Sequence, residues 1–480
     1  MENLVYLEYA VAGFIRYWLL NSDYKQIIGD RVEISTPLNS WKKVTEGAYL
    51  YNEGINPYLG DMFHETPLGL IIFEKMINHI PQWIGIIFIA CDLLTAHVLY
   101  HTAQSFMTEL SSRQIREKDK YAKDADALLL KQSDLLLPPV YVASAYLFNP
   151  YIIFSCVGQT TTVFANLCLA FTFLLMIKGL YFIIIIYYSD STDSNLRFYS
   201  VRTLSKHDLN VMHLFLASSL GQRVACCCML ALATLQSLYP ATLLVPASIY
   251  IAQSERSMTL QGKQPLRASS FVLTVLTFLA ALVLLLYVSS ELAGGWEFLH
   301  ATYGFILNVP DLRPNIGLFW YFFTEMFENF RLLFICAFQI NAALLYLVPL
   351  TLRLHGEPML LAASLTALMA IFKSYPSLGD VGFYLALLPM WKHLFNYMQQ
   401  GFVVGCFFLI TSVMGPIVWH LWIYSRSANA NFYFGVTLAF ATAQIFLVTD
   451  ILFAYIKREF SLYHGLRREI NGKTTKLVLE

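Results

Sequence analysis

Long apolar runs recur along almost the whole chain, and they constrain its fold more than any other feature. A helix that crosses a bilayer needs about 20 mostly apolar residues. Charged residues make up only 13% of the 480 residues, about half the share typical of a soluble domain. A surface this poor in charge could not face water, so the apolar runs must face lipid or one another. The sequence therefore predicts an all-α, polytopic membrane protein with about 10–13 transmembrane helices, some of them broken.

We expect a single polytopic membrane domain over residues 1–480, because apolar runs occur from one end to the other. The first run, near residues 4–20, contains Glu8 and Arg16 and is a weak candidate for a span. No small-residue cleavage site follows it, which favours an uncleaved anchor over a signal peptide. The remaining runs lie near residues 67–80, 82–102, 137–157, 163–188, 224–252, 269–290, 317–352, 358–373, 378–394, 401–424 and 433–455.

Three internal segments carry more specific predictions. Residues 37–51 start with Pro37 after Thr36, a pattern that predicts an amphipathic surface helix with Thr36 as its N-cap. The run at 224–252 contains Pro240 and Pro246, which favour two short helices over one. A third segment, 189–222, is rich in Ser, Asp and Asn and is expected to be a flexible insertion.

The distribution of basic residues predicts the orientation in the membrane. The loop at 104–136 and the tail at 457–480 each hold six basic residues, so we place both in the cytosol. The loop at 21–66 has four basic residues against seven acidic ones and is placed in the lumen. A second luminal stretch then follows at about 291–316.

Several function classes are disfavoured by composition and motif. The chain has 32 basic and 32 acidic residues, whereas a nucleic-acid partner calls for a basic excess. No common nucleophile, zinc-protease, P-loop or dinucleotide motif occurs. The eight cysteines form no C-x-x-C pair, so neither a metal site nor a cofactor site is predicted.

Polar side chains nevertheless gather at the ends of the predicted spans. In the first luminal loop, Glu33, His64 and Glu65 are possible contacts for a sugar, an amine or a phosphate, and the alternative is that they are solvated loop charges. Asp380 flanks an interrupted apolar segment, where a charge is costly unless it is paired or wet.

Two further segments combine amides with aromatic rings. The "GLFWYFF" run at 317–323 predicts an aromatic surface for acyl chains at a membrane boundary, or a re-entrant turn that serves packing. In "WHLWIYSRSANANFYF" the amides suit sugar hydroxyls or phosphate oxygens, although they could equally cap the next helix. The candidate lipid- or glycan-binding residues are Asn429, Asn431, Asn315, Asp380, His420, Phe319, Trp320, Phe322 and Phe323.

These segments, in this order, resemble the U-class subunit of the glycosylphosphatidylinositol (GPI) transamidase. The resemblance runs from about residue 30 to the C-terminus, and the loop at 189–222 departs from it as an insertion. The stretches that carry it are "RVEISTPLNSWKKVTEGAYL" with "FHETPL", "LFNPYIIFSCV", "LYPATLLVP", "YGFILNVPDLRPNIGLFWYFFTEMFENF", "FQIN", "IFKSYPSLGDV", "WHLWIYSRSANANFYF" and "IKREFSLYHGLRREI".

The resemblance implies a multi-pass protein of the endoplasmic reticulum membrane that acts within an enzyme complex. Its implied partners are a caspase-like catalytic subunit, the T-class and S-class subunits and the anchor-attachment subunit. The complex replaces a C-terminal signal of a proprotein with a GPI lipid. The family member itself is expected to be non-catalytic and to bind or present that lipid.

The family is also distantly similar to the polytopic (GT-C-like) mannosyltransferases of the endoplasmic reticulum, which use dolichol-phosphate sugars. Those enzymes place an essential acid early in the first luminal loop, and Glu33 occupies a comparable place here. A mannosyltransferase with Glu33 as general base is therefore the alternative function. A glycolipid transporter is a third possibility, because broken helices also occur in that class.

Overall fold

The computed structural model describes residues 2–177, 209–258, 268–466, 469–470 and 473–474. Nearly all regular structure in these residues is helical. The strands among them, β1 (Glu469–Ile470) and β2 (Lys473–Thr474), form a short antiparallel pair near the C-terminus. The α-helices are α1 (Glu2–Leu20), α2 (Tyr24–Gly29), α3 (Trp41–Asn52), α4 (Pro67–His79), α5 (Ile84–Glu117), α6 (Gln132–Leu136), α7 (Pro138–Leu147), α8 (Pro150–Val157), α9 (Thr162–Ile177), α11 (Leu209–Gln236), α12 (Leu244–Met258), α13 (Ala268–Ala293), α14 (Phe305–Asn308), α15 (Phe319–Glu325), α16 (Glu328–Ile340), α17 (Leu347–Leu354), α18 (Pro358–Phe372), α19 (Leu378–Leu387), α20 (Gly401–Ile423) and α21 (Ala430–His464).

Short 3₁₀ and π turns join or interrupt these helices. The 3₁₀ turns are η1 (Pro57–Leu59), η2 (Pro81–Trp83), η3 (Lys118–Lys120), η4 (Asp126–Leu128), η5 (Tyr239–Leu243) and η8 (Leu388–Tyr397). The π turns are η6 (His300–Gly304) and η7 (Asn341–Leu345).

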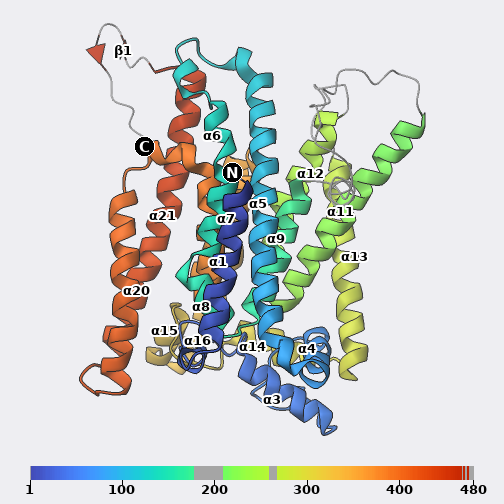
Figure 1. Ribbon diagram of the computed structural model, residues 1–480, viewed down its shortest axis with the longest axis vertical. Coiled ribbons are helices and arrows are strands. Elements are labelled where there is room, and N and C mark those ends of the chain that lie inside the picture. The colour runs from blue at the N-terminus through green and yellow to red at the C-terminus, as the bar shows by residue number, and fades with distance from the viewer. Residues whose placement is uncertain (1, 178–208, 259–267, 467–468, 471–472, 475–480) are drawn as a thin grey trace.

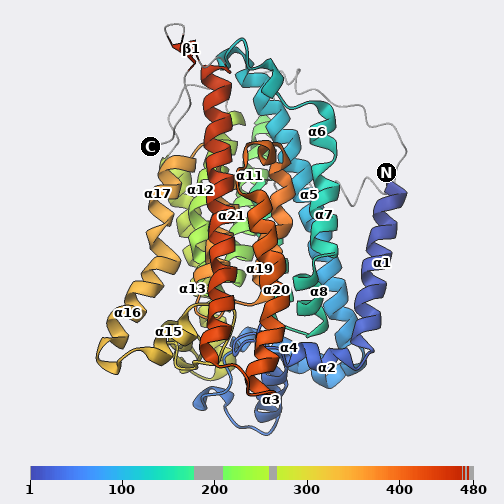
Figure 2. The ribbon, with the colours of Figure 1, turned by 90° about the vertical axis from the view of Figure 1, so that its left-hand side faces the viewer.

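The long helices run side by side along the long axis of the molecule, as an all-α bundle (Figure 1). Helices α3, α4 and α15 gather at one end of the bundle, together with the turn between α20 and α21 (Figures 1 and 2). Helix α6 and the C-terminal end of α21 lie at the opposite end. We call the first end the α3 end and the second the α6 end.

Five helical segments among the described residues are long and apolar enough to cross a membrane: 81–120, α13, 328–354, α20 and α21. The pair 134–147 and α8, bent by 46°, would add a sixth span. Shorter apolar helices occur at Thr162–Ile177, Leu220–Gln236 and Pro358–Phe372. The polytopic all-α architecture is thus confirmed, while the number of spans stays a prediction.

Proline sets the start of several helices. Pro67, Pro138, Pro150 and Pro358 each occupy the first position of a helix, where the missing N–H has no intrahelical partner to lose. The break expected at 224–252 is confirmed, since η5, which contains Pro240, separates α11 from α12. Residues 209–222 of the predicted insertion belong to helix α11, and residues 189–208 lie outside the described residues.

The amphipathic helix of the first luminal loop begins later than predicted. Helix α3 starts at Trp41 with Ser40 in the N-cap position, so the expected N-cap at Thr36 is wrong. Instead, the backbone N–H of Thr36 donates to Asn39 Oδ1 at 2.6 Å, which closes a turn in place of a helix. The helix buries Val44 against its neighbours and packs on α4.

An ion pair in the bundle interior anchors the first helix. Arg16 of α1 and Asp92 of α5 are fully buried and lie 2.6 Å apart, from Nε to Oδ2. Tyr146 of α7 donates its hydroxyl to the same carboxylate at 2.9 Å, and Arg16 also donates to the carbonyl oxygen of Leu147 at 2.9 Å. This network explains how a helix with so poor an apolar run packs into the bundle.

The segments predicted to be cytosolic meet at the α6 end. Helix α5 continues to Glu117, well into the segment expected to be a loop. Beyond it, the N–H of Ala122 donates to the carbonyl oxygen of Leu462, and the N–H of Leu466 donates to Asp124 Oδ2. The segment 104–136 and the end of α21 therefore share one end of the bundle, opposite to the loop at 21–66. Which end faces the cytosol stays a prediction.

Candidate functional site

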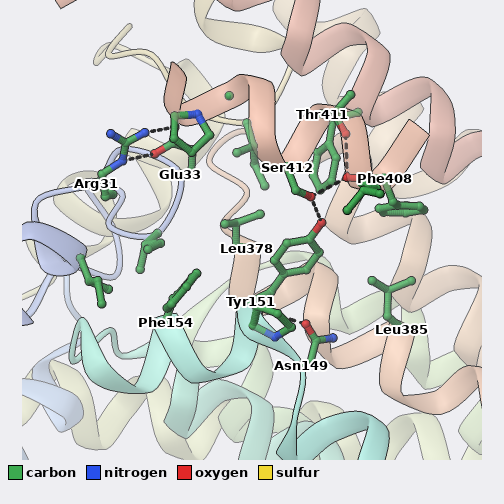
Figure 3. A pocket seen from close by; sticks show the side chains of 18 of the residues that line it. Arg31, Glu33, Asn149, Tyr151, Phe154, Leu378, Leu385, Phe408, Thr411 and Ser412 are labelled. Carbon is green, nitrogen blue, oxygen red and sulfur yellow. Dashed lines mark hydrogen bonds and ion pairs between the residues drawn. The ribbon is translucent and has the colours of Figure 1, made fainter. Parts of the chain in front are cut away.

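A cavity of about 900 Å³ lies between helices α2, α8, α20 and α21. Figure 3 shows it from close by, with Leu378 and Leu385 of α19 among the side chains that line it. Most of its wall is apolar, with side chains such as Phe154, Phe408 and Phe440. Its volume is that of a pocket for a large ligand, and its wall suits hydrocarbon.

The charged side chains of this cavity lie in one place, the loop that follows α2. They are Arg31 and Glu33, and the other side chains of the lining are uncharged. They form a bidentate ion pair, with Arg31 Nε 3.0 Å from Glu33 Oε2 and Nη2 2.8 Å from Oε1 (Figure 3). Their side chains are 22% and 9% exposed, so the pair is mostly buried but still partly accessible to solvent.

The loop that carries this pair is fixed by backbone hydrogen bonds. The N–H of Ile34 and that of Ser35 both donate to the carbonyl oxygen of Arg31. The carbonyl oxygen of Glu33 accepts from the N–H of Leu378, at the start of α19, at 3.0 Å. Asn39 ties the far side of the loop to α9 by donating to Thr162 Oγ1 at 2.9 Å. These hydrogen bonds fix the position of the charged pair relative to the starts of α9 and α19.

Hydroxyl groups and the amide of Asn149 supply the remaining polarity of the wall. The hydroxyls of Tyr151 and Ser412 lie 2.5 Å apart and join α8 to α20 (Figure 3). The hydroxyl of Tyr433, on α21, is buried next to the Glu33 carboxylate and interacts with it. Tyr433 therefore adds a third polar side chain beside the ion pair.

Of the residues selected from the sequence, Glu33 lines this cavity and the amides do not. Asn429 caps α21, since its Oδ1 accepts from the N–H of Asn431 at 3.1 Å. Asn431 in turn accepts a hydrogen bond from the Tyr321 hydroxyl. Asn315 is buried and accepts from the N–H of Gly317 at 2.8 Å. These amides stabilise turns at the α3 end.

Asp380 combines an ion pair with a helix cap. Its Oδ2 lies 2.6 Å from Lys373 Nζ and accepts from the N–H and hydroxyl of Ser377, both at 2.8 Å. Lys373 and Asp380 also line a small cavity of about 60 Å³, together with Asn166 and Tyr239. The pair lies outside the large cavity.

The aromatic run packs into the protein. Phe319 and Phe323 are buried against Phe338 of α16, with ring centroids 5.0 and 5.4 Å apart, and Phe322 contacts the same ring at 4.8 Å. Trp320 is buried among rings of α20 and α21, 6.1 Å from Tyr433. The run thus supports the wall of the cavity from behind and does not line it.

The remaining candidates, His420, His64 and Glu65, also lie outside the cavity and differ in environment. His420 stacks on Tyr424 near the end of α20. His64 is buried with its ring stacked 3.5 Å from that of Phe305, its Nδ1 lies 2.7 Å from the carbonyl oxygen of Ala301, and burial lowers its pKa to about 4. Glu65 is also buried, and burial raises its pKa to about 7. These buried groups brace the loop before α4.

The sequence reasoning missed the residues that give the cavity its shape and polarity. Arg31 was one of several charged residues of the first luminal loop and was not selected among the candidate site residues. Tyr151, Ser412 and Gly415 lie in apolar runs and gave no signal, and Tyr433 follows the amides that drew attention. Across the described residues, no three His, Cys, Asp or Glu side chains are grouped as metal ligands would be.

Comparison with known proteins places the chain in a family. A family model described as "GPI transamidase subunit PIG-U" matches residues 10–440. The "GPI-anchor transamidase component PIGU" of Homo sapiens is 38% identical over 473 residues, which cover 98% of each chain, and the protein of the same name from Mus musculus shows the same identity and coverage. The "GPI transamidase component GAB1" of Saccharomyces cerevisiae is 28% identical over 91% of this chain and 90% of its own. The chain therefore belongs to the PIG-U family of GPI transamidase subunits.

Proposed function

We propose that this protein is the subunit of the GPI transamidase that binds the GPI lipid and presents it for attachment to the C-terminus of proproteins. The observation that carries the proposal is the cavity of about 900 Å³, with its apolar wall and its single charged pair at Arg31 and Glu33. Acyl chains suit the wall, and a phosphate-bearing head group suits the pair.

The position of the pair supports this orientation of the lipid. Arg31 and Glu33 follow α2 and precede α3, and α3 lies at the same end of the bundle as the turn between α20 and α21 (Figure 2). A head group held there would leave its glycan near the amides of Asn429, Asn431 and Asn315. We propose these amides and Asp380 as secondary glycan contacts, and His64 and Glu65 as supports of the adjoining loop.

We further propose that the subunit itself is non-catalytic. Glu33 is the acid that a mannosyltransferase mechanism would use as general base, but both of its oxygens accept from Arg31. A general base needs a lone pair aimed at the acceptor hydroxyl, and the ion pair with Arg31 occupies one lone pair of each oxygen. Bond cleavage would then belong to the caspase-like subunit, with the T-class, S-class and anchor-attachment subunits completing the complex in the endoplasmic reticulum membrane.

Filling the cavity tests the proposal directly. Gly415 of α20 lines the cavity, and a Cβ built on it would meet nothing closer than Glu33 Oε1 at 4.0 Å. The backbone thus accepts a side chain at Gly415, and Gly415→Phe should place its ring in the cavity. Gly405→Phe is the matched control, because Gly405 lies on the same helix, is exposed and has nothing within 4 Å of its Cβ position.

The complex would be purified from membranes with each variant, and its partner subunits and retained GPI lipid measured by mass spectrometry. We expect Gly415→Phe to keep the partner subunits and lose the lipid, and Gly405→Phe to keep both. Retention of the GPI lipid at the wild-type level by Gly415→Phe would reject the cavity as the lipid site. Purification of the chain with a dolichol-linked sugar and without partner subunits would favour the mannosyltransferase alternative.

A further inference from the structure

We propose that the Arg31–Glu33 pair recognises a lipid head group by exchanging partners, so that Arg31 takes a phosphodiester and Glu33 takes a nearby primary ammonium group. This inference rests on the proposed function and names the chemistry that the cavity selects. The ligand class is an amphiphile whose head group carries both charges. The glucosaminyl-phosphatidylinositol core of a GPI lipid has this chemistry, and so does phosphatidylethanolamine.

The composition of the wall argues for such a ligand. Arg31 and Glu33 are of opposite sign and adjacent, and the rest of the lining contributes apolar side chains, hydroxyls and the amide of Asn149. The site is therefore neutral while the pair is intact. A cavity for uncharged lipid would gain nothing from a buried pair, since burying two charges costs more than burying two apolar side chains of similar size.

The balance of charge then decides which ligand fits. An anionic lipid that captured Arg31 would leave Glu33 without a cation in a shielded site, which is strongly unfavourable. A cationic amphiphile that captured Glu33 would leave Arg31 in the same position. A ligand with both a phosphodiester and an ammonium replaces one ion pair with two. Arg31 is suited to the first of these, because a guanidinium binds phosphate oxygens in a bidentate manner.

Two features beside the pair favour the exchange. The Tyr433 hydroxyl is fully buried beside the Glu33 carboxylate and interacts with it, so it can keep a hydrogen bond to Glu33 when Arg31 leaves. Gly415 faces Glu33 from α20, and a Cβ there would still lie 4.0 Å from Glu33 Oε1. The absence of a side chain at this position leaves room for an amine beside the carboxylate.

The test uses two lipids that differ only in the ammonium group. Glucosaminyl-phosphatidylinositol has a primary ammonium, and its N-acetyl form has a neutral amide at the same atom. The whole complex would be placed in phosphatidylcholine nanodiscs, and the affinity for each lipid measured by native mass spectrometry. We expect the wild type to bind the amine form about tenfold more tightly or better, as for loss of one charged hydrogen bond.

Three variants assign the effect to the pair. Glu33→Gln should bind the two lipids equally, because the neutral amide no longer selects an ammonium. Arg31→Gln should weaken the binding of both lipids. Arg313→Gln is the matched control, since Arg313 pairs with Asp311, two residues away, at 3.7 Å but is 63% exposed and lies outside the cavity. It should keep the wild-type affinities.

The outcomes separate this inference from the proposed function. Partner exchange is overturned if the wild type binds both lipids with equal affinity, or if Glu33→Gln keeps the preference for the amine form. The lipid loss expected of Gly415→Phe is a separate measurement and tests the proposed function independently. If the Arg31→Gln variant does not assemble into the complex, the affinities of Glu33→Gln for the two lipids still test partner exchange. A competition with phosphatidylethanolamine identifies the source: displacement at equal concentration supports recognition of the charges in any lipid, and its failure supports recognition within the GPI core.

Discussion

The buried pair of Arg16 and Asp92 gives the sharpest prediction about the stability of the bundle. Arg16→Met leaves the Asp92 carboxylate in the interior with the Tyr146 hydroxyl as its one described hydrogen-bond donor. Asp92→Leu leaves the guanidinium without its counter-ion. Breaking a buried pair from either side costs about 3–5 kcal/mol, so independent effects would add to about 6–10 kcal/mol for the double variant.

We expect the double variant Arg16→Met/Asp92→Leu to be much less damaging than that sum. It removes both charges, and what remains is a Tyr146 hydroxyl without an acceptor and a Leu147 carbonyl without a donor. Each such group costs about 1–3 kcal/mol, which gives a total of about 2–6 kcal/mol. The midpoints of the two ranges differ by about 4 kcal/mol, and this is the coupling energy expected between the two sites.

The free energy of unfolding would be measured for the four proteins by titrating dodecylmaltoside micelles with sodium dodecyl sulfate. Arg353→Met and Glu459→Leu form the control cycle, because that pair, 2.7 Å apart, has side chains 48% and 30% exposed. Its coupling should stay below about 1 kcal/mol. A double variant as unstable as the two single variants added together would refute the assignment of Arg16 and Asp92 as one neutral unit.

Two other predictions concern the loop before α4 and the helix that packs on it. Because burial raises the pKa of Glu65 from 4.5 to about 7, the folded state holds its proton to higher pH than the unfolded state does. Stability should therefore fall as pH rises from 4.5 through 7, by roughly 3 kcal/mol. Thermal unfolding of Glu65→Gln and wild type at pH 5 and pH 8 measures this loss, and the variant should not show it. Equal pH profiles of the two proteins would contradict the prediction. His64 is present in both proteins, so its own titration cancels in the comparison. In helix α3, a Cβ on Gly47 would overlap the ring of Phe63. Gly47→Ala should therefore destabilise the protein by about 1–3 kcal/mol, although alanine has the better helix propensity. A higher midpoint of thermal unfolding for this variant would contradict the packing.

Much of the fold could be predicted from the chain because local rules act within single helices. Apolar runs marked α13 and α20, and the runs predicted at 137–157 and 358–373 begin within one residue of α7 and α18. The start of α3 could not be read in the same way. Thr36 and Pro37 match the rule for a helix start, but Asn39 competes with a hydrogen bond of its own and delays the helix to Trp41.

The cavity could not be predicted, because its wall is assembled from segments more than 400 residues apart, from Ile27 to Phe440. A side chain such as Ser412 becomes part of a polar contact only when α8 delivers Tyr151 to it. The same reasoning explains the aromatic run at 317–323. Its composition suited a lipid surface, yet tertiary packing against α16 buried Phe319 and Phe323 among other rings.

The ion pair of Arg16 also has a consequence for how the protein is made. Asp92 is synthesised 76 residues after Arg16, so the first helix carries an uncompensated cation until α5 has been made. Such a charge costs a few kcal/mol at the middle of a helix during insertion, so α1 alone is expected to enter the bilayer reluctantly. Its stable packing would wait for α5 and α7, so the first helix to be made is not the first to be secured.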